Sequence, residues 1–194
     1  EPRPGQIAMA ERVAQAIDWD ERLLAEAGTG TGKTMAYLLP AILSGRKVVV
    51  STGTRTLQDQ IAKIDLPRLQ RALPEPFTFA VMKGLSNYVC LRRFDEHTQQ
   101  LEIAAARHPD SERVRAWVGK TKTGDRAELD GLSEGAAIWH EITASPETRL
   151  GSRCSYAENC FVTQMRRQAA QAQVVVVNHH LFLADLALRR RWPE

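Results

Sequence analysis

The stretch AGTGTGKT, residues 27–34, determines how the rest of this chain is read. Apolar residues at 22–27 precede it and predict a strand, while the run at 35–39 predicts the start of a helix. A strand, a glycine-rich loop and a helix in this order are typical of a phosphate-binding loop. The glycines let backbone N–H groups turn inward around a polyphosphate, and the helix N-terminus adds partial positive charge. A glycine-rich turn that binds nothing is the less favoured alternative.

The side chains at the end of this loop have the chemistry of nucleotide binding. We expect Lys33 to reach the β- and γ-phosphates of ATP and the Thr34 hydroxyl to ligate Mg²⁺, so these two residues are the catalytic candidates. Ala27 stands where the stricter pattern has glycine. The loop residues expected to bind the nucleotide are Ala27, Gly28, Thr29, Gly30, Thr31, Gly32, Lys33 and Thr34.

Composition sets broad limits on the class of protein. The 194 residues are 43% hydrophobic and 25% charged, as in an ordinary globular domain with one core or with an insertion. The net charge of +3 permits a nucleic-acid partner without requiring one. No apolar run approaches the roughly 18 residues that span a bilayer, and the N-terminus lacks the apolar region of a signal peptide. We therefore expect a cytoplasmic protein with no membrane partner.

Two features predict that the chain is the front part of a longer motor. It lacks an initiator Met and ends after 189–194 without a closing element. A P-loop enzyme also needs an acidic motif at the end of a strand, and no apolar run leads into Asp-Glu after Lys33.

Hydrophobic patterning predicts alternating helices and strands around the loop. Helices are expected over 4–18, 33–43, 56–64 and 161–171, and strands over 22–27, 47–51, 77–82 and 174–177. The unbroken β-branched runs in 47–51 and 174–177 indicate strands buried on both faces of a parallel sheet. Residues 83–153 are rich in charge and lack such a run, which favours a separate insertion of helix and loop.

The expected fold is therefore α/β, with a doubly wound parallel sheet and a mainly helical insertion that carries cysteines. We place the first part of the sheet domain at 1–82, the insertion at 83–165 and the return to the sheet at 166–194.

Six motifs then occur in one order. They are RPGQ at 3–6, EAGTGTGKT at 26–34, STGTRTLQDQ at 51–60, KGLSNYVC at 83–90, GDR at 124–126 and VVVVNHHLFLAD at 174–185. Together they resemble the DinG/YoaA branch of the XPD-like superfamily 2 DNA helicases over nearly the whole chain. The resemblance implies a RecA-like motor domain with an iron–sulfur insertion, and an ATP-dependent enzyme that moves 5′ to 3′ on single-stranded or forked DNA in DNA repair. It also implies that a DEAH-type box and a second motor domain lie beyond this segment.

The resemblance assigns roles to residues outside the phosphate loop. It implies that Gln6 reads adenine, since a carboxamide can donate and accept at once; an exposed helix residue is the alternative. It implies that Thr52, Thr54 and Arg55 bind DNA phosphates without reading bases. The alternative there is a plain turn in which Thr54 caps the next helix.

The cysteines leave the cofactor open. The resemblance implies a [4Fe–4S] cluster held by Cys90, Cys154, Cys160 and a fourth cysteine, but the fourth position is Arg149. A guanidinium offers no lone pair to iron. The alternatives are a cluster with three cysteines and an external ligand, a labile or absent cluster, a change of residue 149 itself, or unrelated thiols. The wide spacing disfavours zinc.

Other side chains remain open between two interpretations. Lys83, Arg92, Arg93, Arg166 and Arg167 form either a DNA-guiding rim or a solvated face. Tyr88 either stacks on a base or packs. The resemblance implies that Asn178 and His179 lie near the edge of strand ends that meets nucleotide and DNA, as structural couplers. Two other functions are kept: a nucleotide- and DNA-binding module without turnover, and a P-loop phosphotransferase such as a kinase.

Overall fold

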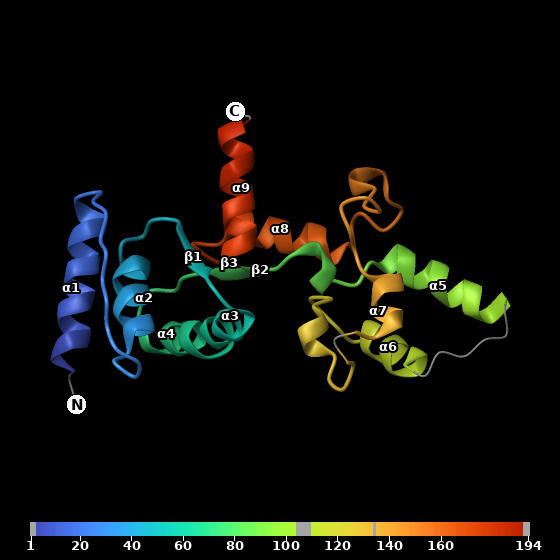
Figure 1. Ribbon diagram of the computed structural model, residues 1–194, viewed down its shortest axis with the longest axis horizontal. Helices are drawn as coiled ribbons and strands as arrows, with labels where there is room; N and C mark the ends of the chain where they lie inside the picture. Colours follow the sequence, from blue (N-terminus) through green and yellow to red (C-terminus); the bar gives the residue numbers. More distant parts are fainter. Residues whose placement is uncertain (1–2, 104–109, 134, 192–194) are drawn as a thin grey trace. The chain divides into compact units, whose positions relative to one another are not determined.

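The computed structural model describes residues 3–103, 110–133 and 135–191 and contains two compact units (Figure 1). The sheet unit comprises Glu1–Met82 and Gln168–Glu194, and the insertion unit comprises Lys83–Arg167. Compactness defines these units, so the functional domain boundaries expected after residues 82 and 165 stay predictions.

A three-stranded parallel sheet lies at the centre of the sheet unit. It contains β1 (Val48–Thr52), β2 (Phe79–Met82) and β3 (Val174–Asn178) in the order β1-β3-β2. Val174 of β3 is in register with Val48 on one side and Phe79 on the other. The predicted parallel α/β fold is thereby confirmed, and three of the four expected strands form.

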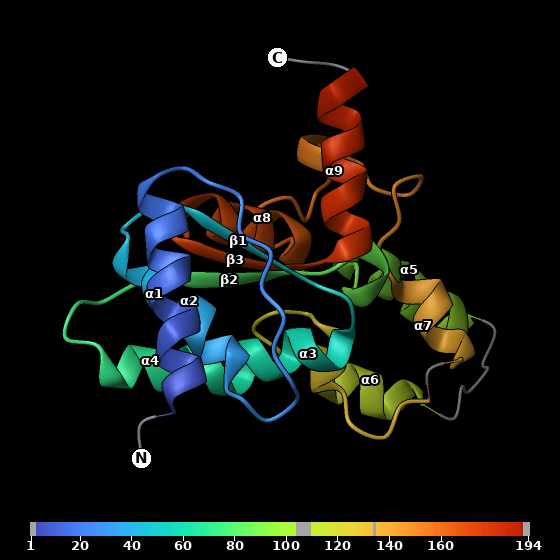
Figure 2. The same cartoon turned by 60° about the vertical axis from the view of Figure 1, so that its left-hand side comes forward.

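Helices cover both faces of this sheet. The sheet unit contains α1 (Pro4–Asp18), α2 (Lys33–Leu43), α3 (Arg55–Gln60), a turn of π-helix (Ile61–Asp65), α4 (Leu66–Ala72), the end of α8 (Phe161–Gln171) and α9 (His179–Arg191). α1 packs beside α2, and Figure 1 shows it on the side of α2 that faces away from the sheet; Figure 2 brings this side of the unit to the front. The helix predicted over 56–64 begins one residue earlier and passes through the π-turn.

Successive valines of β3 point to opposite faces of the sheet, and this strand therefore has no polar face. Val174 and Val176 join one core cluster with Leu38 and Ile61, while Val175 and Val177 join another that includes Ala169. Each face of the strand is therefore packed, which is why a parallel strand reads as a continuous β-branched run.

The strand predicted over 22–27 is wrong. These residues carry no strand pairing, and Leu24 is fully exposed. An apolar run becomes a strand only where a neighbouring strand takes up its backbone hydrogen bonds, and in the described sheet β1 and β2 pair with β3. Apolar composition alone therefore misplaced this element.

A buried glutamine connects α3 to two strands. The Gln58 side chain is inaccessible to solvent, and its Nε2 donates to the carbonyl of Met82 at 3.0 Å and to that of Val176 at 3.2 Å. These bonds tie α3 to the backbone of β2 and of β3.

The insertion unit is built on helices and loops with a core of its own. Its helices are α5 (Leu91–Ile103), α6 (Ser111–Val118), α7 (Ala137–Ile142) and the first part of α8, joined by turns at Leu85–Asn87, Arg126–Glu128 and Gly151–Arg153. Trp139 is the largest of the fully buried side chains among the described residues. Its ring centroid lies 5.9 Å from that of Trp117, with the ring planes tilted by 57°, and its Nε1 donates to the Ser86 carbonyl at 2.8 Å. Lys83 and Asp125 form a largely buried ion pair at 2.7 Å.

Tyr88 packs inside this unit, which decides between its two interpretations. Its side chain is 3% exposed, and its hydroxyl accepts a hydrogen bond from the Lys83 backbone at 3.3 Å. Burial, opposed by this hydrogen bond and reinforced by Asp125, raises the pKa of Tyr88 to about 12. Such a residue cannot stack on a base.

Replacing Gln58 by leucine is expected to lower the free energy of unfolding by about 1–3 kcal/mol, since the variant loses the hydrogen bonds from the Gln58 amide to two strand carbonyls. Denaturant titration of the purified variant measures this change. Gln60→Leu, on an exposed site of the same helix, serves as the control and is expected to change stability by roughly 0.5 kcal/mol or less. Equal stabilities for the two variants would contradict the proposed role of Gln58.

Tyr88 is expected to make stability fall at alkaline pH. Because its pKa rises from 10.0 to about 12 on folding, the folded state keeps the proton longer than the unfolded chain. The stability linked to this proton is complete below pH 10 and is lost as pH rises toward 12, by about 1.4 kcal/mol per unit. Tyr88→Phe cannot lose this proton, so the unfolding free energy of wild type should fall relative to that of Tyr88→Phe between pH 10 and 12. A constant difference between the two proteins over this range would refute the prediction.

Candidate nucleotide and nucleic-acid site

The loop at residues 27–34 forms a tight cradle that ends at the N-terminus of α2. Gly30 and Gly32 have φ angles of +77° and +81°, in the left-handed region that favours glycine. At Gly32 a Cβ would also stand 2.5 Å from the Gln6 Nε2, so a larger residue would have to displace the Gln6 amide, while the φ angle itself favours glycine. Lys33 is the first residue of α2, which places the positive end of the helix dipole at the loop.

Lys33 curls back over this cradle. Its Nζ donates to the carbonyls of Ala27 at 2.6 Å and Gly28 at 2.5 Å, while the Thr31 hydroxyl donates to Gly28 at 2.9 Å. The ammonium group therefore stands over the loop, where phosphate oxygens could replace the carbonyls as its partners.

Thr34 lies in the first turn of α2 and hydrogen-bonds with the phenol of Tyr37. Burial raises the pKa of Tyr37, and the Thr34 bond opposes this effect. The hydroxyl expected to ligate Mg²⁺ is thus held by a neighbouring phenol on its own helix.

The start of α1 is tied to the phosphate loop. Arg3 Nη1 donates to the Gly30 carbonyl at 2.6 Å, and Gln6 Nε2 donates to the Gly32 carbonyl at 3.1 Å. The sequence singled out Gln6 for adenine, and the structure places its amide beside the loop. Arg3 was missed as a site residue; its place in the motif RPGQ was the signal available.

A cavity of about 470 Å³ opens between α1 and the loop. Its lining includes Gln6, Met9, Arg12, Leu23, Glu26 and Lys33. Apolar and charged groups thus meet beside the Lys33 ammonium, a combination suited to a ligand with a ring and an anionic tail.

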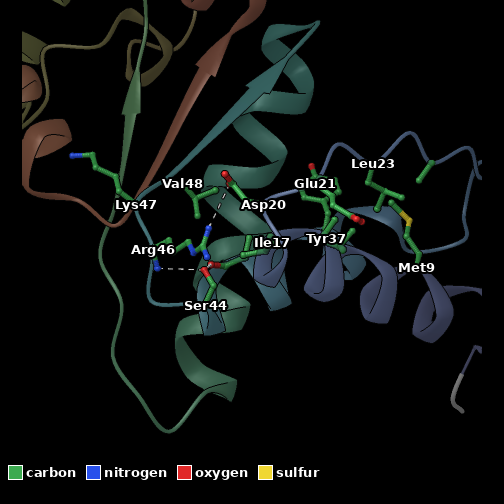
Figure 3. Close-up of a pocket in the computed structure, with 14 residues that line it drawn as sticks. Met9, Ile17, Asp20, Glu21, Leu23, Tyr37, Ser44, Arg46, Lys47 and Val48 are labelled. Carbon is green, nitrogen blue, oxygen red and sulfur yellow. Dashed lines mark hydrogen bonds and ion pairs between the residues drawn. The ribbon is translucent and has the colours of Figure 1, made fainter.

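A second groove, of about 550 Å³, lies between α1, α2 and the start of β1 (Figure 3). Met9, Ile17, Leu23, Tyr37 and Val48 give it an apolar wall. The ion pair of Asp20 and Arg46, 3.9 Å apart, stands at its rim.

The turn after β1 holds the three residues expected to meet DNA. Thr52 is 2% exposed, and its hydroxyl donates to the carbonyls of Thr54 at 3.2 Å and Val177 at 3.4 Å. The Thr54 hydroxyl accepts from the Leu57 backbone at 3.2 Å and caps α3, as the alternative interpretation expected. Arg55 is exposed. Thr54 and Arg55 are thus the exposed members of the three, and the Thr54 hydroxyl still has its proton to donate.

The end of β3 lies beside this turn. Asn178 caps α9 by accepting from the Leu181 backbone at 2.7 Å, and His179 Nδ1 lies 2.7 Å from the Ser51 hydroxyl oxygen. The expected edge of strand ends is therefore formed by β1 and β3.

The cysteines were expected to converge on a cluster, and they do not form a ligand set here. Cys90, Cys154 and Cys160 are half-buried free thiols. Within the described ranges, no group of three or more Cys, His, Asp or Glu side chains is arranged to hold a metal ion.

Arg149 packs next to Cys160 instead of leaving room for a ligand. Its Nη2 donates to the Thr163 hydroxyl at 3.2 Å, and among the described residues its buried Nε has no partner. Burial raises the pKa of the Cys160 thiol, but hydrogen bonds from Thr163 and Val162 and the charge of Arg149 bring it below its ordinary value. The residues present do not fit a [4Fe–4S] cluster held by four thiolates.

Arg92 and Arg93 are engaged within the insertion unit, whereas Arg166 and Arg167 are exposed. Arg92 contacts Glu96 at 2.5 Å and the Thr148 carbonyl at 2.9 Å. Arg93 donates to the carbonyls of Glu141 at 2.7 Å and His140 at 3.1 Å. These bonds favour a structural role over a DNA-guiding rim.

The described part of the chain contains no helix of the length and apolar character needed to cross a bilayer.

Known proteins similar to this chain are nucleic-acid enzymes. The DEAD/DEAH box helicase family matches residues 4–76. The ATP-dependent DNA helicase YoaA of Haemophilus influenzae is 42% identical over 189 residues, which cover 97% of this chain and 30% of the relative. The ATP-dependent helicase DinG of Mycobacterium tuberculosis is 38% identical over 206 residues, covering 94% of this chain and 31% of the relative.

A further relative carries a different printed activity. The 3'-5' exonuclease DinG of Bacillus subtilis is 34% identical over 199 residues, covering 100% of this chain and 21% of the relative. Over nearly its whole length this chain is thus similar to the DinG and YoaA helicases, and it spans about 30% of the length of the first relatives it matches.

Proposed function

We propose that this chain supplies the ATP-binding and part of the DNA-binding surface of an ATP-dependent DNA helicase. The observation that carries the proposal is the cradle of Gly30 and Gly32 with the Lys33 ammonium above it at the start of α2. The matches to helicases named ATP-dependent support it over most of the chain. We further propose 5′-to-3′ movement on single-stranded or forked DNA, a role in DNA repair and a cytoplasmic location.

The loop residues would act through their backbone and through two side chains. Backbone N–H groups and the N-terminus of α2 would hold the phosphates, and Lys33 would exchange its two carbonyl partners for phosphate oxygens. Thr34 would hold Mg²⁺, which neutralises charge on the phosphates when bound. Gln6 and the lining of the 470 Å³ cavity would receive the base.

Arg55 and the backbone of the turn before α3 would bind the DNA backbone. An exposed guanidinium beside strand ends suits phosphate contacts that carry no base information. Thr52 would contribute by fixing the turn, because its buried hydroxyl already donates to internal carbonyls. The exposed Thr54 hydroxyl accepts from Leu57 and would donate its own proton to a phosphate.

A binding module without turnover is the second candidate for the chain taken alone. Among the described residues that line the cavity beside the loop, Glu26 is the one carboxylate. Phosphoryl transfer needs an acidic residue that holds Mg²⁺ and a residue that orients the attacking water. We therefore expect this segment by itself to bind ATP weakly and not to unwind DNA.

Replacing Lys33 by alanine is expected to weaken ATP binding by roughly 10- to 100-fold, because the variant loses a charge-assisted hydrogen bond to phosphate. Titration calorimetry with MgATP measures the affinity. Lys63→Ala, which removes an exposed lysine that pairs with Asp59 on the surface, is the control and should bind as wild type does. Unchanged affinity in Lys33→Ala would refute the assignment of the loop, and duplex unwinding by the 194-residue chain alone would contradict the second candidate.

Arg149→Cys is expected to raise the iron content toward about four per chain, because it completes four thiolates. Iron and acid-labile sulfide, measured after anaerobic purification, check this. Arg153→Cys, which adds an exposed thiol in the neighbouring turn, is the matched control, and its iron content should be as low as that of wild type. A full complement of iron in wild type, or no gain in Arg149→Cys, would refute the interpretation of Arg149.

A further inference from the structure

The carboxyl ends of β1 and β3 are joined by one side-chain hydrogen bond. The strands are paired up to the register partners Thr52 and Asn178. One residue before this pair, Ser51 places its hydroxyl oxygen 2.7 Å from Nδ1 of His179, the residue that follows Asn178. The bond therefore extends the connection between the strands to the point where β1 and β3 both end.

The same imidazole lies beside the turn after β1. Its Cδ2 and Nε2 atoms both lie 3.6 Å from the position that a Cβ on Gly53 would take. Glycine has no Cβ, so the ring lies beside Gly53 with space for one further carbon atom between them. His179 thus bonds to the residue at one end of the turn and lies beside its middle.

Two hydroxyl groups hold the rest of the turn through three hydrogen bonds. The Thr52 hydroxyl bridges the carbonyls of Thr54 and Val177, and the Thr54 hydroxyl caps α3. Arg55 follows at once and is exposed. The direction of Arg55 is therefore set by a turn that rests on β3 and on His179.

We propose that His179 is a positioning residue for DNA binding, which acts through Ser51 and Gly53 on the turn that presents Arg55. This inference rests on the proposed function, in which that turn contacts the DNA backbone. A turn held in its binding conformation before DNA arrives loses less conformational entropy on binding, and so binds more tightly. His180, the next residue, is exposed and offers a matched control.

The test measures the affinity of the chain for a fluorescein-labelled single-stranded oligothymidylate by anisotropy at fixed salt. His179→Ala and Ser51→Ala are each expected to weaken binding by about fivefold, as for the loss of one hydrogen bond. The double variant should be no weaker than either single variant, since both remove the same bond. His179→Asn, whose amide can occupy the position of Nδ1, should restore affinity to within about twofold of wild type, and His180→Ala should match wild type.

The outcomes separate this inference from the proposed function. If wild type binds DNA and Arg55→Ala binds less, but His179→Ala binds as wild type, the positioning role is overturned and the proposed function stands. If His179→Asn binds as poorly as His179→Ala, the hydrogen bond is not the cause and the inference is again overturned. If wild type does not bind the oligonucleotide, the DNA-binding part of the proposed function fails, and the inference fails with it. Should His179→Ala not fold, Ser51→Ala removes the same bond and decides the question.

Discussion

The pairing of β3 with two other strands is the constraint on which the sheet unit depends. β3 lies between β1 and β2 and has Val174 in register with the first residue of each. Its four valines alternate between two core clusters, so this strand links the helices on one face of the sheet to those on the other. Because β3 follows the insertion in the sequence, the edge that carries the turn at Gly53 is complete only after the chain has returned from it.

The two parts of the candidate site depend on the rest of the sheet unit to different degrees. The phosphate loop depends on local geometry, with two left-handed glycines and a helix start, and on α1, which ties Arg3 and Gln6 to the loop carbonyls. The turn beside the strand ends depends on neighbours that are distant in sequence, since Thr52 and Ser51 bond to groups at the end of β3. The first part is a property of one segment, whereas the second is a property of the sheet.

The insertion unit has stabilising interactions that involve no metal. Trp139 and its neighbours form its core, and the Lys83–Asp125 ion pair is largely removed from water. Removing one partner of such a pair leaves a buried charge, so the pair constrains the structure around it. Arg149 fits this picture, because its guanidinium bonds to Thr163 beside Cys160 where the family resemblance implies a thiolate. Where the resemblance implies a fourth thiolate, this unit therefore carries a guanidinium, which has no lone pair to offer iron.

The sequence by itself determined the elements whose signals are local. The glycine-rich loop, the helices around it and the β-branched strands were all predicted, because backbone conformation and burial on both faces leave marks on neighbouring residues. Thr54 as a helix cap was also foreseen as an alternative for the same reason. Tertiary structure decided what depends on partners: 22–27 stays unpaired, Gln58 bonds to carbonyls of two strands, and His179 meets Ser51. Hydrogen bonds between residues far apart in the chain have no period and no spacing, so they exist only once the strands have paired.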